Sequence, residues 1–157
     1  MYKKILVPLD GSKLAECVLP HVEAIAKGID ARTVILVSVT ERVLGYRPVT
    51  DYEEAVEERL VPEAVGKMEQ QAQEYLDRIA KRLNAKGIET ETLVLLGDPA
   101  EEITINAKHY GTDLIIMASH GRSGISRWTH GSVADKVFRA SSVPVLMVRA
   151  PVGKPSV

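Results

Sequence analysis

The stretch DLIIM-ASHGRSGISRWTHGS-VADKVF, residues 113–138, joins three local patterns that together decide the fold. The apolar run at 113–117 predicts a buried strand, and the spacing of Val133 and Val137 predicts a helix. The segment between them, 118–132, holds three glycines, four serines, two arginines and two histidines. Glycine lets backbone N–H groups approach a ligand closely, and a helix N-terminus carries partial positive charge. A loop of this kind between a strand and a helix suits an anion, most often a phosphate.

The rest of the chain repeats this alternation of strand and helix. Continuous apolar runs predict buried strands at residues 5–9, 34–39, 92–96, 114–117 and 145–148. Helical spacing of apolar residues lies between them, at 15–26 with a stop at Gly28, at 61–83 with a stop at Gly87, from Asp98 to near Gly111, and from about Ser132. Asp98 is expected to cap its helix, with Glu101 completing a capping box. The alternation predicts a parallel sheet with right-handed crossovers.

Two loops of this predicted sheet are rich in polar residues and glycine. One is Asp10-Gly11-Ser12 after the first strand, and the other is the 118–132 loop after the fourth. Ligands of open α/β sheets bind beyond the carboxyl ends of the strands, where the strand order reverses. The order 3-2-1-4-5 would bring these two loops together. We therefore predict an α/β fold with a five-stranded parallel sheet in the order 3-2-1-4-5 and helices on both faces.

Composition limits the class of protein. The 157 residues predict one domain over 1–150 and a frayed tail at 151–157. A net charge of −1 does not fit a nucleic-acid surface. No apolar run is long enough for a membrane span or a signal peptide, so we expect a cytoplasmic protein. The single cysteine, Cys17, excludes an internal disulfide and is expected to be a small buried apolar residue.

The one long connection is expected at residues 41–60. It carries Asp51, Glu53, Glu54, Glu57 and Glu58 together with Tyr46 and Tyr52. Two interpretations remain open, a solvated excursion and a mobile lid or partner surface, because long loops in compact domains are often functional.

The 118–132 loop differs from the common phosphate-binding motifs. A P-loop needs G-x-x-x-x-G-K-[ST], and there is no lysine between Lys108 and Lys136. A dinucleotide fingerprint belongs after the first strand, where the chain has only Asp10-Gly11-Ser12. No H-E-x-x-H or Cys/His spacing indicates a structural zinc.

The loop instead resembles the nucleotide-binding branch of the universal stress protein family, whose pattern is G-x-x-G-x9-G-[ST] after the fourth strand. Ala118, Gly121, Gly131 and Ser132 occupy the four positions of the pattern with its spacing intact. Residues 5–12 (ILVPLDGS) and 142–149 (SVPVLMVR) are similar to the first and last parts of the family domain. The resemblance covers nearly the whole chain and is weakest across 41–60. It implies a Rossmann-like fold of the adenine nucleotide alpha hydrolase type.

One residue departs from the family pattern, because Ala118 replaces the first glycine. With a negative φ the added methyl group costs little. With a positive φ it would add strain of about 1 kcal/mol or more.

We assign roles to individual residues as hypotheses. Gly131 and Ser132 are expected to hold phosphates, although Ser132 could instead cap the helix with Asp135 as its capping-box partner. Gly121 is expected to allow close backbone approach. Asp10 could bind a ribose hydroxyl, or Mg²⁺ or Mn²⁺ together with the phosphates, or it could form an Asx turn or a helix N-cap. Charge around the loop comes from His120, Arg122, Arg127 and His130, and Trp128 is expected to anchor the loop.

The family resemblance implies that Pro8 and Val39 contact the adenine. The full set of residues expected to contact the nucleotide is Pro8, Asp10, Gly11, Ser12, Val39, Met117, Ala118, His120, Gly121, Arg122, Gly124, Gly131, Ser132 and Val133.

Three functions fit these patterns. We favour a regulatory protein that binds ATP, or ADP or AMP, with little or slow hydrolysis and no dedicated catalytic residue. A slow ATPase or phosphotransferase is the second, although Asp10 is the only carboxylate placed in the site and no clear base is evident. The third is a dimeric interaction protein with incidental nucleotide. The resemblance implies a homodimer, and the strand at 145–148 would lie on a sheet edge open to pairing.

Overall fold

The computed structural model describes residues 2–40, 54–119 and 131–149, with the helical residues 54–65 described as backbone only. The strands are β1 (Lys4–Pro8), β2 (Thr33–Thr40), β3 (Thr90–Leu96), β4 (Leu114–Ala118) and β5 (Val145–Val148). The α-helices are α1 (Leu19–Gly28), α2 (Glu54–Asn84), α3 (Pro99–His109) and α4 (Ser132–Ala140), and a 3-10 turn η1 (Ala15–Val18) precedes α1.

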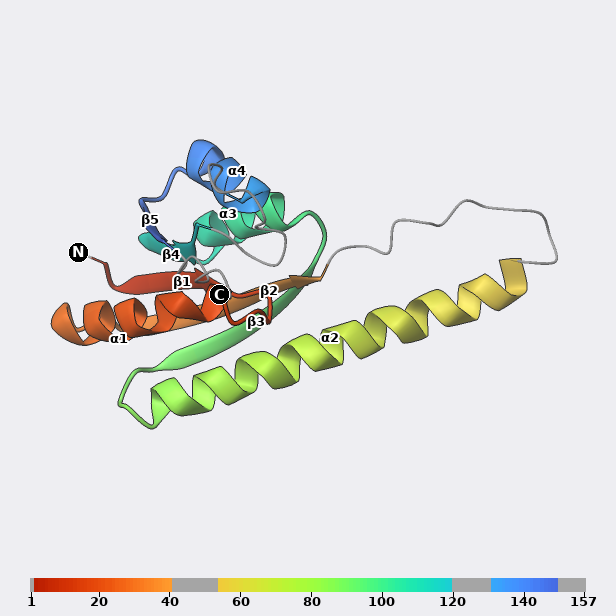
Figure 1. Cartoon of the computed structure of the whole chain (residues 1–157), viewed down its shortest axis with the longest axis horizontal. Helices are drawn as coiled ribbons and strands as arrows, with labels where there is room; N and C mark the ends of the chain where they lie inside the picture. The colour runs from red at the N-terminus through yellow and green to blue at the C-terminus, as the bar shows by residue number, and fades with distance from the viewer. Residues whose placement is uncertain (1, 41–53, 120–130, 150–157) are drawn as a thin grey trace, which may run out of the picture.

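All five strands form one parallel sheet in the order β3-β2-β1-β4-β5, which confirms the predicted order (Figure 1). The central strands β1, β2 and β4 are almost wholly buried. The chain runs outward from β1 to β3 on one side, then returns across the sheet to β4 on the other. The reversal therefore lies between β1 and β4.

Two layers of helices cover the sheet, as predicted, with α1 and α2 on one face and α3 and α4 on the other (Figure 1). The alternation of side chains along β1 divides the core. Ile5 and Val7 pack with α1 and α2, whereas Leu6 packs with α3 and α4. Both cores are aliphatic, as the scarcity of aromatic residues suggests.

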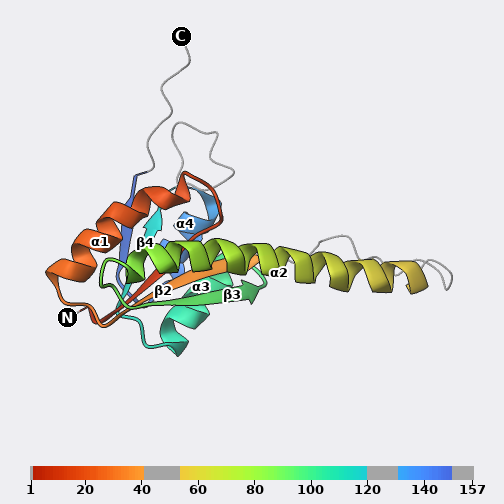
Figure 2. The ribbon, with the colours of Figure 1, turned by 90° about the horizontal axis from the view of Figure 1, so that it is seen from below.

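Helix α2 begins at Glu54, so the prediction of one connection through residue 60 was wrong. Only its last turns pack firmly, through Leu76, Ile79 and Leu83, which are at most 6% exposed. Its first turns continue past the sheet, as both views show (Figures 1 and 2). Met68, which lies within the predicted helical spacing of residues 61–83, is 40% exposed. Sequence periodicity thus located the packed half of the helix and missed the part beyond the sheet edge.

The other helix ends agree with the sequence, with small corrections. Asp98 caps α3, because its Oδ1 accepts the N–H of Glu101 at 3.0 Å, and Pro99 is the first helical residue. Gly28 is the last residue of α1 rather than a residue beyond it. The predicted first helix opens as the separate 3-10 turn η1.

The outer strands are less buried than the continuous apolar runs predicted. β3 is mostly half-buried, and Leu146 of β5 is 37% exposed. Each of these strands has a neighbour on one side only, which explains the difference. None of the helices in the described ranges combines the length and apolarity that a membrane span requires.

Candidate functional site

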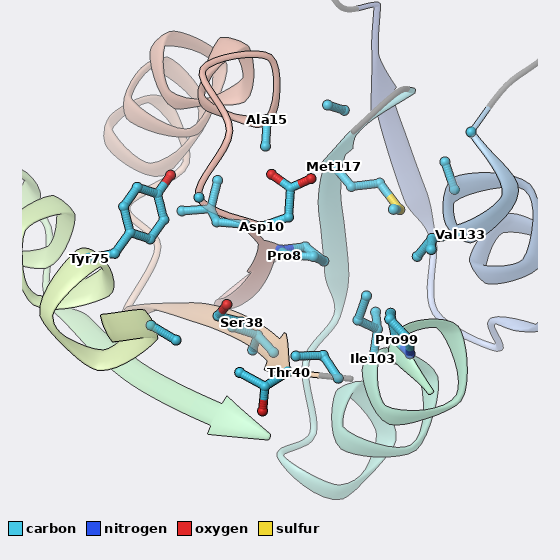
Figure 3. A pocket seen from close by; sticks show the side chains of 18 of the residues that line it. Pro8, Asp10, Ala15, Ser38, Thr40, Tyr75, Pro99, Ile103, Met117 and Val133 are labelled. Atoms are coloured by element: carbon cyan, nitrogen blue, oxygen red, sulfur yellow. The ribbon is translucent and has the colours of Figure 1, made fainter. Parts of the chain in front are cut away.

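A cavity of about 570 Å³ opens at the carboxyl ends of β1, β2 and β4, at the reversal of the strand order (Figure 3). It is lined by Pro8, Leu9, Asp10, Gly11, Ala15, Val37, Ser38, Val39, Thr40, Met68, Gln71, Ala72, Tyr75, Pro99, Ile103, Met117, Ala118, Gly131, Ser132, Val133 and Ala134. Its residues come from β1, β2, β4, η1, α2, α3 and α4.

The cavity reaches around both faces of the sheet edge. On the α3/α4 side it is lined by an apolar lobe, defined as Val39, Pro99, Ile103, Met117 and Val133. On the α2 side it is lined by a polar lobe, defined as Ser38, Thr40, Gln71 and Tyr75. The two lobes follow from strand alternation, since Val39 and its neighbours Ser38 and Thr40 face opposite sides of β2. Figure 3 shows Tyr75 and Val133 at opposite walls.

Asp10 follows β1 and lies between the two lobes, in a tight turn. Its Oδ1 accepts the backbone N–H of Ser12 at 2.9 Å and the Ser12 hydroxyl at 2.6 Å. The Ser12 Oγ in turn accepts the N–H of Ala15 at 3.1 Å, at the start of η1. Gly11 has φ +83°, a left-handed conformation that favours glycine. The Asx turn considered from the sequence is therefore present, and it fixes the carboxylate of Asp10 at the cavity.

The N-terminus of α4 forms another wall. Gly131 is the N-cap residue, with φ −53°, and its N–H donates to the carbonyl of Ser119 at 2.7 Å. The proposed capping role of Ser132 is wrong, because Ser132 is the first helical residue and Asp135 pairs with Arg139 at 2.9 Å. No side chain among the described residues caps the helix. Within the described part of the chain, therefore, no side chain occupies the N–H groups of the first turn, where the positive end of the helix dipole also lies.

The glycine-to-alanine departure at Ala118 causes no backbone strain. Ala118 is the last residue of β4, pairs in register with Val148 and is 8% exposed. It is not among the described residues with positive φ. An extended backbone accepts a methyl group at this position without cost.

Tyr75 extends from α2 into the polar lobe, and its hydroxyl donates to Glu16 Oε1 at 3.3 Å. Burial raises the pKa of the Tyr75 phenol, and the charge and hydrogen bond of Glu16 and the charge of Asp10 raise it further. The Arg78 guanidinium, 5.9 Å from the ring centre, acts in the opposite direction. Two carboxylates, Glu16 and Asp10, thus lie near Tyr75 in the polar lobe, whereas the N-terminus of α4 carries the positive end of a helix dipole.

Most of the described residues expected at the site line this cavity. They are Pro8, Asp10, Gly11, Val39, Met117, Ala118, Gly131, Ser132 and Val133. Ser12 is not a lining residue and instead holds Asp10. The remaining candidates, His120, Gly121, Arg122, Gly124, Arg127, Trp128 and His130, lie outside the described residues.

Sequence analysis missed the α2 wall and the polar end of β2. Met68, Gln71 and Tyr75 belong to an ordinary amphipathic helix, and nothing local marks them as lining a cavity. Ser38 and Thr40 carried a usable signal, since they are the hydroxyl residues at the carboxyl end of an otherwise apolar strand. Cys17, expected to be buried, is half-buried against the α1/α2 core, and burial raises the pKa of its thiol.

The chain is similar to known proteins along nearly its whole length. The model of the universal stress protein family matches residues 1–149. The universal stress protein MJ0577 of Methanocaldococcus jannaschii is 37% identical over 95% of this chain and 96% of its own. The solved structure of MJ0577 superposes with a TM-score of 0.83, covering 98% of this chain and 99% of that one, at 35% identity.

Two more distant structures share the fold and carry nucleotides. A universal stress protein in complex with cAMP has a TM-score of 0.63 at 21% identity, covering 94% of this chain and 97% of that one. A universal stress protein family protein of Arabidopsis thaliana with AMP bound has a TM-score of 0.64 at 15% identity, covering 95% and 92%.

Proposed function

The chain belongs to the universal stress protein family, and from this premise we propose that its cavity binds an adenine nucleotide, with ATP as the principal ligand, as a regulatory signal. The observation that carries the proposal is the joining of two features at one cavity. The uncapped first turn of α4 offers N–H donors and positive potential, and the Asp10 turn presents a carboxylate nearby. The AMP and cAMP held by two fold relatives support the choice of adenine.

The two ends of the cavity suggest how the nucleotide lies. The phosphates occupy the end at Gly131 and Ser132, where N–H groups and the dipole of α4 stabilise negative charge. The base lies at the carboxyl end of β2, where the two lobes meet, with Pro8 and Val39 among its contacts. The ribose lies near Asp10, between the two. ADP or AMP would occupy the same place with fewer phosphate contacts.

Mg²⁺ or Mn²⁺ would accompany the phosphates. The described residues contain no group of three or more metal-ligating side chains, so the protein alone offers no complete cage. Mg²⁺ in nucleotide sites is commonly held by one or two carboxylates together with phosphate oxygens. Asp10, the carboxylate that lines the cavity in the described part of the chain, fits that mode.

Hydrolysis is expected to be slow. Efficient phosphoryl transfer needs a base or a water-orienting residue beside the phosphates. Asp10 is the carboxylate among the described lining residues, and its Oδ1 already accepts two hydrogen bonds from Ser12. The alternative of a true ATPase gains support if turnover exceeds about one per minute and disappears in Asp10→Ala.

The test of nucleotide binding is direct. Purified protein is denatured by heat, and the released small molecules are identified by mass spectrometry. Protein freed of ligand is then titrated with ATP and Mg²⁺ by calorimetry, with GTP as the comparison. Release of an adenine nucleotide, or saturable heat with ATP, is the expected result. Protein that carries no nucleotide and gives no heat with millimolar ATP contradicts the proposal.

We further propose that the chain is cytoplasmic and, separately, that it forms a homodimer through the edge strand β5. Its outer side has no neighbouring strand in the described sheet, and Leu146 is 37% exposed. Phe138 lies on α4, the helix that precedes β5 in the chain, and is 56% exposed. Leu146→Glu would place a charge in that contact and should shift the sedimentation coefficient from dimer to monomer. A wild-type monomer, or a variant that stays dimeric, contradicts this proposal.

A further inference from the structure

Ser38 places a hydroxyl group in the polar lobe of the cavity. Ser38 lies on β2, is 7% exposed and lines the cavity. Its side chain has no hydrogen-bond partner within the described part of the chain. By contrast, Thr40, two residues on and on the same face, donates its hydroxyl to the carbonyl of Leu95 at 3.1 Å.

The small exposed part of the Ser38 side chain faces the cavity. In the described ranges, no fully enclosed side-chain polar atom lacks a hydrogen-bond partner. The Ser38 oxygen is therefore accessible, and the side chain faces the space between Tyr75 and Pro8 (Figure 3). Buried polar groups in proteins nearly always have partners, because an unpaired hydroxyl loses its hydrogen bonds to water. A buried hydroxyl that meets a cavity without a protein partner is placed for a ligand.

Resting on the nucleotide site proposed above, we infer that Ser38 is a specificity-determining residue whose hydroxyl accepts a hydrogen bond from the 6-amino group of the adenine. This hydrogen bond would favour a base that carries a 6-amino group, and it is separate from the phosphate contacts at α4.

The order of the strands sets the distance from the phosphates to Ser38. Phosphates at the first turn of α4 lie beyond β4, and β1 separates β4 from β2. Neighbouring strands lie about 4.8 Å apart, so β4 and β2 are separated by roughly 10 Å. An adenosine phosphate spans a comparable length from its first phosphate to its 6-amino group. The group farthest from the phosphates therefore reaches the end of β2.

The charges near the polar lobe also favour the base, rather than the phosphates, at Ser38. The Tyr75 hydroxyl donates to Glu16 Oε1 at 3.3 Å, and Asp10 lines the same cavity, so both negative charges lie near the polar lobe. Arg78 opposes them, but it lies by the Tyr75 ring, and Lys13, which pairs with Glu16 at 3.6 Å, is 93% exposed. A phosphate would be repelled in this lobe. A neutral donor such as an exocyclic amino group is favoured there.

We expect Ser38→Ala to weaken ATP binding without lowering the stability of the protein. The variant removes a ligand contact but breaks no hydrogen bond within the described protein, so its thermal midpoint should equal or slightly exceed that of the wild type. Thr40→Val removes the bond to Leu95 and should lower the midpoint. Ser142→Ala, in the exposed turn before β5, is the neutral control for both measurements.

Calorimetric titration of the full chain tests the contact. Ser38→Ala should weaken ATP binding by about 2- to 10-fold, the effect of one neutral hydrogen bond. The wild type should lose a similar factor with purine riboside triphosphate, which lacks the 6-amino group. With that analogue the wild type and Ser38→Ala should bind equally. With 2′-deoxy-ATP the difference between the two proteins should remain.

Two results overturn the inference while leaving the nucleotide site intact. In the first, Ser38→Ala binds ATP as tightly as the wild type. In the second, the effect of the substitution persists with purine riboside triphosphate and disappears with 2′-deoxy-ATP, which would assign Ser38 to the ribose. Failure of the wild type itself to bind ATP overturns the proposed function and this inference with it.

Discussion

The paired substitutions Asp10→Asn and Asp10→Ala separate the structural role of Asp10 from its proposed role toward the ligand. Asp10 Oδ1 accepts two hydrogen bonds from Ser12, at 2.9 and 2.6 Å. Asparagine has the same acceptor in the same position and lacks the charge. Alanine lacks both. The carboxamide should therefore preserve the turn, whereas the methyl group should not.

The magnitudes follow from the two hydrogen bonds. Bonds to a charged group contribute about 1.5–3 kcal/mol each when buried, and the half-buried position of Asp10 reduces this value. We expect Asp10→Ala to lower the free energy of unfolding by about 2–3 kcal/mol and Asp10→Asn by about 1 kcal/mol. For a protein of this size, 1 kcal/mol corresponds to a shift of about 2–4 °C in the melting temperature.

Both variants should lose ATP affinity in the presence of Mg²⁺, because both lack the charge that would face the metal. Circular dichroism during heating gives the stability, and calorimetry with and without Mg²⁺ gives the affinity. Ser12→Ala is the matched control, since it removes the 2.6 Å bond but keeps the carboxylate. Equal destabilisation by asparagine and alanine would refute the account of the turn. Wild-type affinity for ATP and Mg²⁺ in Asp10→Asn would refute the role of the charge.

Two further predictions concern stability. Asp98→Ala should lower the free energy of unfolding by about 1 kcal/mol in chemical denaturation because it removes the cap of α3, whereas Asp98→Asn should stay within a few tenths of wild type; equal losses would contradict the capping role. The raised pKa of Tyr75 means that the folded state holds this proton more tightly than the unfolded chain, in which the phenol has its ordinary pKa of 10.0. The resulting stabilisation is complete below that ordinary value and is lost as pH rises through the higher value of the folded state. Denaturation between about pH 9 and 11.5 should therefore show a steeper loss of stability in the wild type than in Tyr75→Phe, and parallel curves would contradict the assignment.

The sequence predicted the parts of the fold that depend on local pattern. Continuous apolar runs marked the strands, and β5 was predicted with its observed limits, 145–148. The strand order was predicted because it brings together the loops at Asp10 and at Gly131, which both have the composition of a ligand site, and the structure confirms it. The cap at Asp98 followed from hydrogen-bonding chemistry within four residues.

Features that depend on the packing of helices and strands against one another could not be predicted from local sequence patterns. The start of α2 at Glu54 lies beyond the sheet, so no core-facing periodicity marked it. Tyr75 lines the cavity because of where α2 crosses the sheet edge, which is a tertiary property. The helix cap fell on Gly131 rather than Ser132, a shift of one residue that periodicity does not resolve. Ser38 was visible as a polar residue in an apolar strand, but its missing partner is evident only in three dimensions.

The most direct measurement of the central claim is a two-dimensional amide NMR titration that compares ATP with adenosine. Ser132, Val133 and Ala134 begin α4 and line the cavity, and N–H groups in a first helical turn have no partner within the helix. If they hold the phosphates, their resonances should move strongly with ATP and little with adenosine, while Val39 responds to both ligands. Saturable ATP binding that leaves these three amides unmoved would contradict the claim that the first turn of α4 receives the phosphates.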